Sequence, residues 1–245
     1  MGLRFKANLI AGLVVLICLL APSGLLADGF ITVNAADNIY AAGTQSGLAG
    51  NFVGSSSGLV PVYIDVSGEN FLTFSVTGTI IVNEGSGNNV NDPDGVGAAV
   101  STSSNTGYGS ISGIEAPGAG YLVGVFIGPG GPSGPAPASL DFIGNTSFTS
   151  LSPLLDQVFF IGDGLTGDGT GATQVFYVPA GATDLYLGIS DAGGYNGPPT
   201  GGYGDNIDSF DVTYTSVPES SSLSLLACGL IALGWLFPKR RALFS

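Results

Sequence analysis

Hydrophobic and polar residues alternate along several stretches of the chain between residues 28 and 216. Within residues 72–77, Leu72, Phe74 and Val76 alternate with Thr and Ser, which is the pattern of a strand with one buried and one exposed face. Similar patterns lie at residues 61–66, 121–127, 173–178, 185–190 and 209–215. No segment between them repeats apolar residues with a helical period, so we expect short strands throughout this part of the chain.

Glycine-rich connections separate these segments. The chain contains 41 glycines, and most of them fall between the expected strands, as in folds with many short strands and turns. We therefore predict an all-β fold, an antiparallel β-sandwich, over residues 28–216, a length sufficient for one core. Aromatic and β-branched residues argue against disorder in the strand segments, whereas residues 86–108 and 128–138 stay open between loop and disorder.

Positive and negative charges are separated along the chain. All but one of the 18 Asp and Glu residues lie between residues 28 and 216, where there is no cationic side chain. Such carboxylates stay solvated, accept hydrogen bonds or bind a metal ion. The same segment is unsuited to nucleic acid, whose phosphates are bound by Lys and Arg. The Lys and Arg residues are all terminal: Arg4, Lys6, Lys239, Arg240 and Arg241.

This segment also lacks the side chains that most enzymes use. Residues 28–216 contain no Cys, His, Lys or Arg, so most pairings of a nucleophile with a base are absent. Two carboxylates are sufficient for glycoside hydrolysis, but the spacing of the acidic residues selects no pair. We therefore predict a protein without enzymatic activity.

The first 27 residues have the features of a secretory signal peptide. Arg4 and Lys6 precede an apolar run at residues 9–21, and a short segment with small residues follows before Asp28. We predict cleavage after Ala27 and export of the domain at residues 28–216.

The C-terminal segment predicts a transmembrane helix. Residues 223–237 are apolar on every face and are followed by the basic tail at residues 239–241. The run is shorter than the roughly 20 residues of a relaxed span, but local thinning of the bilayer accommodates a short helix. The basic cluster places the C-terminus in the cytoplasm and the domain outside.

The order of a short motif, an apolar helix and a basic tail over residues 217–241 resembles a PEP-CTERM sorting signal. Ser220 stands where that family usually has a second proline. The resemblance implies recognition by an exosortase, removal of the helix and delivery to the cell surface or the extracellular polymer. A simple membrane anchor is the alternative. The residues that match the signal are Val217, Pro218, Glu219, Lys239, Arg240 and Arg241.

A glycine-rich loop at residues 190–210 brings several oxygen-bearing side chains to the ends of two expected strands. Asp191 follows the first strand, and Asp205 and Asn206 precede the second. Asp208 lies two residues beyond Asn206 and is a second-tier candidate. Calcium accepts carboxylate, amide and backbone oxygens, whereas zinc has no His or Cys here. We therefore predict calcium as the cofactor.

The segments VPAGATDLYLGISDA, GGYGDN and SFDVTYT resemble the C-terminal half of the PA-I galactophilic lectins. Those proteins are calcium-dependent β-sandwiches, so the resemblance implies a galactose-binding or jelly-roll-like sandwich. At the matching positions, it implies that calcium is held by the side chains of Asp191, Asp205 and Asn206 and by the backbone oxygen of Gly202.

Further upstream, NFLTFSVTGTIIV and NDPDG resemble the other half of the same fold. This resemblance implies that the backbone oxygen of Val82 completes the calcium shell and that Asp92 and Asp94 contact a sugar. Asp92 replaces the family's His. NDPDG is also a favourable reverse turn by its own chemistry. Residues 192–201 form a longer loop than in the lectins, which reshapes or blocks the sugar site.

Other residues of the acidic loops have alternative roles. Tyr195 or Tyr203 could stack on a sugar ring, or could pack the loop against the sandwich. Asp163 and Asp168 lie among glycines at a spacing loosely like calcium turns, but a glycine-rich hairpin turn with solvated aspartates explains them better than a further ion.

Two functions fit these observations. The first is an exported calcium-dependent carbohydrate-binding protein that holds an extracellular polysaccharide or another glycan. The second is a structural protein of the extracellular matrix in which calcium only stiffens the loops.

Overall fold

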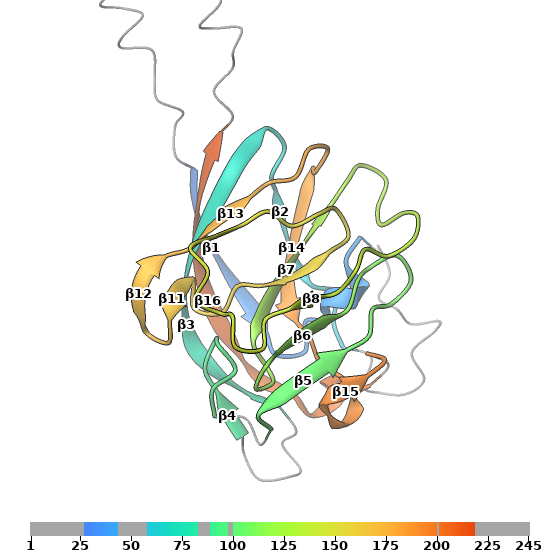
Figure 1. Ribbon diagram of the computed structural model, residues 1–245, viewed down its shortest axis with the longest axis vertical. Coiled ribbons are helices and arrows are strands. Elements are labelled where there is room, and N and C mark those ends of the chain that lie inside the picture. Colours follow the sequence, from blue (N-terminus) through green and yellow to red (C-terminus); the bar gives the residue numbers. More distant parts are fainter. Residues whose placement is uncertain (1–26, 44–57, 83–88, 98–99, 200, 219–245) are drawn as a thin grey trace, which may run out of the picture. The chain divides into compact units, whose positions relative to one another are not determined.

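The structure is a computed structural model that describes residues 27–43, 58–82, 89–97, 100–199 and 201–218 (Figure 1). Strands dominate these ranges, where helix is limited to the short 3-10 turns η1 (Ile39–Ala41), η3 (Gly193–Tyr195) and η4 (Tyr203–Asp205). The expected all-β class is therefore confirmed. Residues Leu26–Val217 form one compact unit, to which the description below refers.

The largest sheet contains the first and the last strand of this unit. β1 and β16 pair antiparallel over their length, from Ala27 opposite Ser216 to Asn34 opposite Ser209. β4 (Asn89–Asn91) pairs with β3 off the main path. The strand order is β1 (Ala27–Asn34), β16 (Ile207–Pro218), β3 (Glu69–Val82), β13 (Val175–Tyr177) and β9 (Ser150–Leu151).

A second sheet is built around β7 and β14, two neighbouring strands in its interior. Every residue of β7 is buried, which differs from the half-buried strand expected here, because its sequence is apolar throughout and both of its faces are covered. β14 ends at Ile189, which pairs with Leu122 at the start of β7. This end of β14 leads directly into the glycine-rich loop that carries Asp191 and Asp205. The order is β10 (Val158–Phe160), β7 (Leu122–Ile127), β14 (Asp184–Ile189) and β2 (Val62–Asp65).

Shorter strands form the remaining pairings. β11 (Leu165–Gly167) and β12 (Thr170–Thr173) make a two-stranded hairpin. Three short pairs, β13 with β9, β15 with β5 and β6 with β8, are parallel, unlike the antiparallel arrangement predicted. The last sheet has the order β15 (Asn196–Gly197), β5 (Thr102–Asn105), β6 (Ile114–Pro117) and β8 (Leu140–Asp141).

Aromatic side chains from the two larger sheets meet in the hydrophobic core. The ring centroid of Phe176 in β13 lies 5.3 Å from that of Phe74 in β3 and 5.5 Å from that of Phe159 in β10. Phe126 of β7 stacks on Phe159 at 5.1 Å. All four rings are buried. Because an aromatic ring buries a large apolar area, this cluster stabilises the packing of one sheet on the other.

The terminal signals lie almost wholly outside the described residues. This applies to residues 1–26 of the predicted signal peptide, to the predicted helix at 223–237 and to Glu219 and the basic tail. Val217 and Pro218 form the end of β16. Within the ranges that the structure describes, no helix is long and apolar enough to cross a membrane.

Candidate functional site

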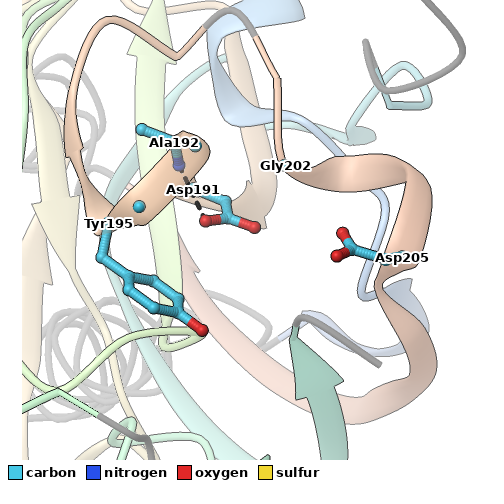
Figure 2. A pocket seen from close by; sticks show the side chains of 7 residues that line it. Asp191, Ala192, Tyr195, Gly202 and Asp205 are labelled. Atoms are coloured by element: carbon cyan, nitrogen blue, oxygen red, sulfur yellow. Dashed lines mark hydrogen bonds between the residues drawn. The ribbon is translucent and has the colours of Figure 1, made fainter. Parts of the chain in front are cut away.

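The loop between β14 and β16 encloses a small cavity (Figure 2). η3 and η4 both contribute to its lining, η3 through Gly193 to Tyr195 and η4 through Asp205. The cavity has a volume of about 100 Å³. Its lining residues are Asp191, Ala192, Gly193, Gly194, Tyr195, Gly202 and Asp205.

Asp191 is the most deeply buried carboxylate of this site, with only 4% of its surface exposed. Its Oδ1 accepts the backbone N–H of Ala192 at 2.7 Å, and its Oδ2 accepts the Nδ2–H of Asn206 at 3.0 Å. Burial raises the pKa of Asp191 from 3.8 to about 7, against the effect of these hydrogen bonds and with a small addition from the charge of Asp205. A buried carboxylate without a cation is costly when ionised, and a bound metal ion would remove that cost.

Asn206 joins Asp191 to the first strand of the domain. Its Nδ2 also donates to the backbone oxygen of Ala35 at 3.1 Å. Only 7% of the surface of Asn206 is exposed, and its Oδ1 is buried without a hydrogen-bond partner. Buried amide oxygens are nearly always satisfied in folded proteins, so this oxygen lacks the partner that its burial normally requires.

Gly202 allows the backbone to lie directly against the Asp191 carboxylate. Its φ of +105° is in the left-handed region that favours glycine. A Cβ at this position would lie 3.2 Å from both Cγ and Oδ2 of Asp191. Only glycine therefore satisfies both the backbone conformation and the close approach.

Asp205 lies at the end of η4, and its carboxylate faces that of Asp191 across the cavity (Figure 2). Within the described residues, no three Asp, Glu, His or Cys side chains converge closely enough to hold a metal ion by themselves. The lining of the cavity has only two carboxylates with backbone groups beside them, and the amide of Asn206 adjoins it through Asp191. That mixture is the chemistry that calcium accepts.

The two tyrosines of the loop have different positions. Tyr195 lines the cavity and has a φ of +63°, which is uncommon for a residue other than glycine. Tyr203 is only 1% exposed, and its hydroxyl is bonded to the backbone of Ile189 and Asp191. The expectation that Tyr203 could stack on a sugar is therefore wrong, because its ring is enclosed by protein. Tyr203 packs the loop instead.

Besides Asn206, which is joined to the cavity only by its hydrogen bond to Asp191, two of the expected calcium ligands lie outside its lining. Val82 is the buried last residue of β3, where its side chain lies beside Gly120 and its backbone is opposite Asn89 of β4. Asp208 is exposed at the start of β16, and its backbone oxygen accepts the N–H of Ala35. The structure thus brings together Asp191, Gly202, Asp205 and Asn206, but not these two.

Asp94 lines a second cavity, of about 90 Å³, together with residues that the sequence left separate, and Asp92 is hydrogen-bonded to the backbone of Asp94. Asp94 Oδ1 accepts the N–H of Asp163 at 3.1 Å. The carboxylate of Asp163 in turn accepts the N–H groups of Leu165 and Gly169. Burial, and next the charge of Asp163, raise the pKa of Asp94 from 3.8 to about 7. The reverse turn at NDPDG and the turn at residues 162–169 therefore form one acidic cluster.

The lining of this second cavity includes Asp94, Val96, Pro117, Thr146, Leu165, Gly167 and Asp168. Asp92 Oδ1 accepts the N–H groups of Asp94 and Val96, as the turn chemistry of NDPDG predicts. The sugar contact expected for Asp94 would thus be made at a cavity whose lining shares no residue with that of Asp191, and Asp92 lines neither cavity.

Sequence analysis missed the contribution of Ala35 to the site. Its backbone oxygen holds the Asn206 amide from a position 171 residues away in sequence. An alanine at the end of a strand carries no signal for this role. Comparisons with protein families, with curated proteins and with solved structures found no match to the chain.

Proposed function

We propose that this protein is an exported calcium-dependent carbohydrate-binding protein. The observation that carries the proposal is the pairing of the buried Asp191 carboxylate with an Asn206 amide whose oxygen is unsatisfied. The carboxylate of Asp205 and the backbone oxygen of Gly202 supply further ligands at the same cavity. Bound calcium would offer open positions to the hydroxyl groups of a saccharide, and Tyr195 lies where a ring could contact it.

Thermal unfolding of the purified protein in EDTA, in millimolar calcium and in millimolar magnesium tests the metal site. Calcium at about 100 times its dissociation constant stabilises the folded state by roughly 2.7 kcal/mol, which raises the Tm by roughly 5 to 11 °C for a domain of this size. Asp191→Asn should remove this rise. Asp211→Asn is the matched control, because Asp211 is an exposed carboxylate of β16 that bonds Thr32. No selective shift with calcium would refute the site.

A glycan array then tests the ligand. Binding that requires calcium and is lost in Asp191→Asn supports a carbohydrate-binding protein. The chain is expected not to turn over chromogenic glycosides, because no pair of carboxylates at the site is supported as an acid and a nucleophile.

One observation favours the second candidate, a structural protein of the extracellular matrix. The loop that follows Asp191 is fixed to another sheet, since Asn196 and Gly197 of β15 pair with Ser104 and Asn105 of β5. This pairing holds the part of the loop that follows Tyr195 against β5. Calcium-dependent self-association without any glycan hit would support this alternative.

The proposed route of the protein follows from its ends. We propose export by the signal peptide, tethering to the inner membrane by residues 223–237, and release to the surface or matrix by an exosortase-type enzyme. Mass spectrometry of the mature protein tests both cleavages. A mature chain that keeps residues 223–237 would indicate a simple membrane anchor.

A further inference from the structure

The backbone around Asp191 lies beyond the end of the strand ladder. The last pair between β14 and β7 joins Ile189 to Leu122, so the polar groups that follow need partners from elsewhere. Tyr203 supplies them. Its hydroxyl accepts the N–H of Asp191 at 3.0 Å and donates to the backbone oxygen of Ile189 at 3.0 Å.

Ser190 is held from other elements. Its Oγ is 2.8 Å from the hydroxyl of Tyr40 in η1 and accepts the Nδ2–H of Asn105 in β5 at 2.7 Å. The hydroxyl of Tyr121, which precedes β7, is 3.0 Å from the Oγ of Ser103 in β5. Tyr40, Tyr121 and Tyr203 are all buried, and placing such hydroxyls in a core is costly unless they are hydrogen-bonded.

Tyr203 differs from the other two tyrosines because it belongs to the ligand-bearing loop. It follows Gly202 directly and begins η4, which ends at Asp205. Its side chain reaches back to the backbone on both sides of Ser190. One phenol therefore ties the turn with Gly202 and Asp205 to the strand end with Asp191, and sets the separation of the two.

We infer that Tyr203 is a positioning residue that holds the two ligand-bearing segments of the cation site at the distance the ion requires. The inference rests on the proposed function, since it assigns a role within that site. Residues that orient metal ligands commonly change affinity by roughly 10- to 100-fold when they are altered.

Tyr203→Phe tests the inference, because it removes the hydroxyl and keeps the ring. Tyr186→Phe is the matched control: Tyr186 is a half-buried tyrosine of β14 that does not line the cavity. Terbium is the probe, since it takes oxygen ligands as calcium does and its luminescence lifetimes in H₂O and D₂O count the water molecules bound to it. Calcium affinity is measured by displacement of terbium.

In the full-length protein, Tyr203→Phe should bind calcium about 10- to 100-fold more weakly and should show more bound water on terbium than the wild type. Tyr186→Phe should match the wild type in both. If Tyr203→Phe binds with unchanged affinity and water count, the inference is overturned. If the wild type itself binds neither ion, the proposed function fails instead, so the two failures are distinct.

A second variant, Tyr40→Phe, tests the inference in case Tyr203→Phe does not fold. Circular dichroism in EDTA would reveal whether Tyr203→Phe is folded. Tyr40→Phe removes the hydroxyl that holds Ser190 from η1. It should also increase the water count on terbium, because Asp191 follows Ser190 directly. If Tyr203→Phe does not fold and Tyr40→Phe binds like the wild type, the positioning of Asp191 by buried tyrosines is refuted.

Discussion

Replacing Gly202 by Ala has two effects that a matched control can separate. One is the cost of a positive φ, and the other is crowding of the Asp191 carboxylate. Gly202 and Gly197 both lie in the same loop with a positive φ, of +105° and +95°. A Cβ at Gly202 would be 3.2 Å from Cγ and Oδ2 of Asp191, whereas a Cβ at Gly197 would have no neighbour within 4 Å. Gly197→Ala is therefore a matched control with a similar backbone cost and no crowding.

The two variants should differ in their response to calcium rather than in EDTA. Each should lose roughly 1–2 kcal/mol in EDTA from the left-handed backbone, which lowers the Tm by roughly 2–8 °C. In Gly202→Ala, the Asp191 carboxylate must also withdraw by roughly 0.3–0.8 Å to restore ordinary contact distances. Calcium–oxygen distances span only about 2.3–2.6 Å, so this displacement should remove most of the rise in Tm with calcium.

Differential scanning fluorimetry or calorimetry with and without calcium measures both effects. Gly197→Ala should keep the rise in Tm that the wild type shows. The reasoning is refuted if Gly202→Ala gains as much from calcium as Gly197→Ala does, because the carboxylate would then not be a ligand at that position.

Three further predictions concern pH, the second acidic cluster and the core. The pKa values of Asp191 and Asp94 are raised from 3.8 to about 7, so the folded state binds protons that the unfolded chain does not. In EDTA, the stability that results from these protons is fully present below about pH 4 and is lost as the pH rises through about 7. Tm values measured over this pH range check the prediction, and a Tm that does not change with pH would contradict both pKa shifts. Asp94→Asn should raise the Tm at pH 8 and leave it nearly unchanged below pH 4, and no gain at pH 8 would mean that the carboxylate is not repelled there. Phe176→Ala should reduce the free energy of unfolding by about 3–5 kcal/mol in urea, whereas Phe30→Ala, at a side chain 67% exposed, should cost far less; equal losses would contradict the assigned core.

The strands with an apolar face could be predicted from the sequence, because burial imposes alternation on them. Leu72, Phe74 and Val76 of β3 are buried, as their alternation with polar residues predicts. β5 could not be found in this way, since its inward-facing residues are Ser103 and Asn105. Their burial depends on hydrogen bonds to Tyr121 and Ser190, which no local pattern reveals. β4 and β5 thus occupy a segment left open between loop and disorder.

Only the part of the candidate site that lies at strand ends could be predicted from the sequence. Asp191 follows β14 and Asn206 precedes β16, and their side chains meet as expected. The hydrogen bond between Asp94 and Asp163 joins turns 69 residues apart. Which turns meet depends on the packing of the whole domain, so the sequence could not assign Asp92 and Asp94 to the cluster in which they lie.

The pairing of β1 with β16 also bears on the mechanics of a tethered protein. Ala27 and Ser216 lie opposite each other, so the chain enters and leaves the domain at the same end of one strand pair. A pull on Pro218 directed along β16 loads the hydrogen bonds to β1 and to β3 together, in shear, because β16 lies between these two strands. A pull that separated the two chain ends would instead break the bonds to β1 one after another. The direction of an anchor relative to β16 would therefore decide how much drag the folded domain withstands.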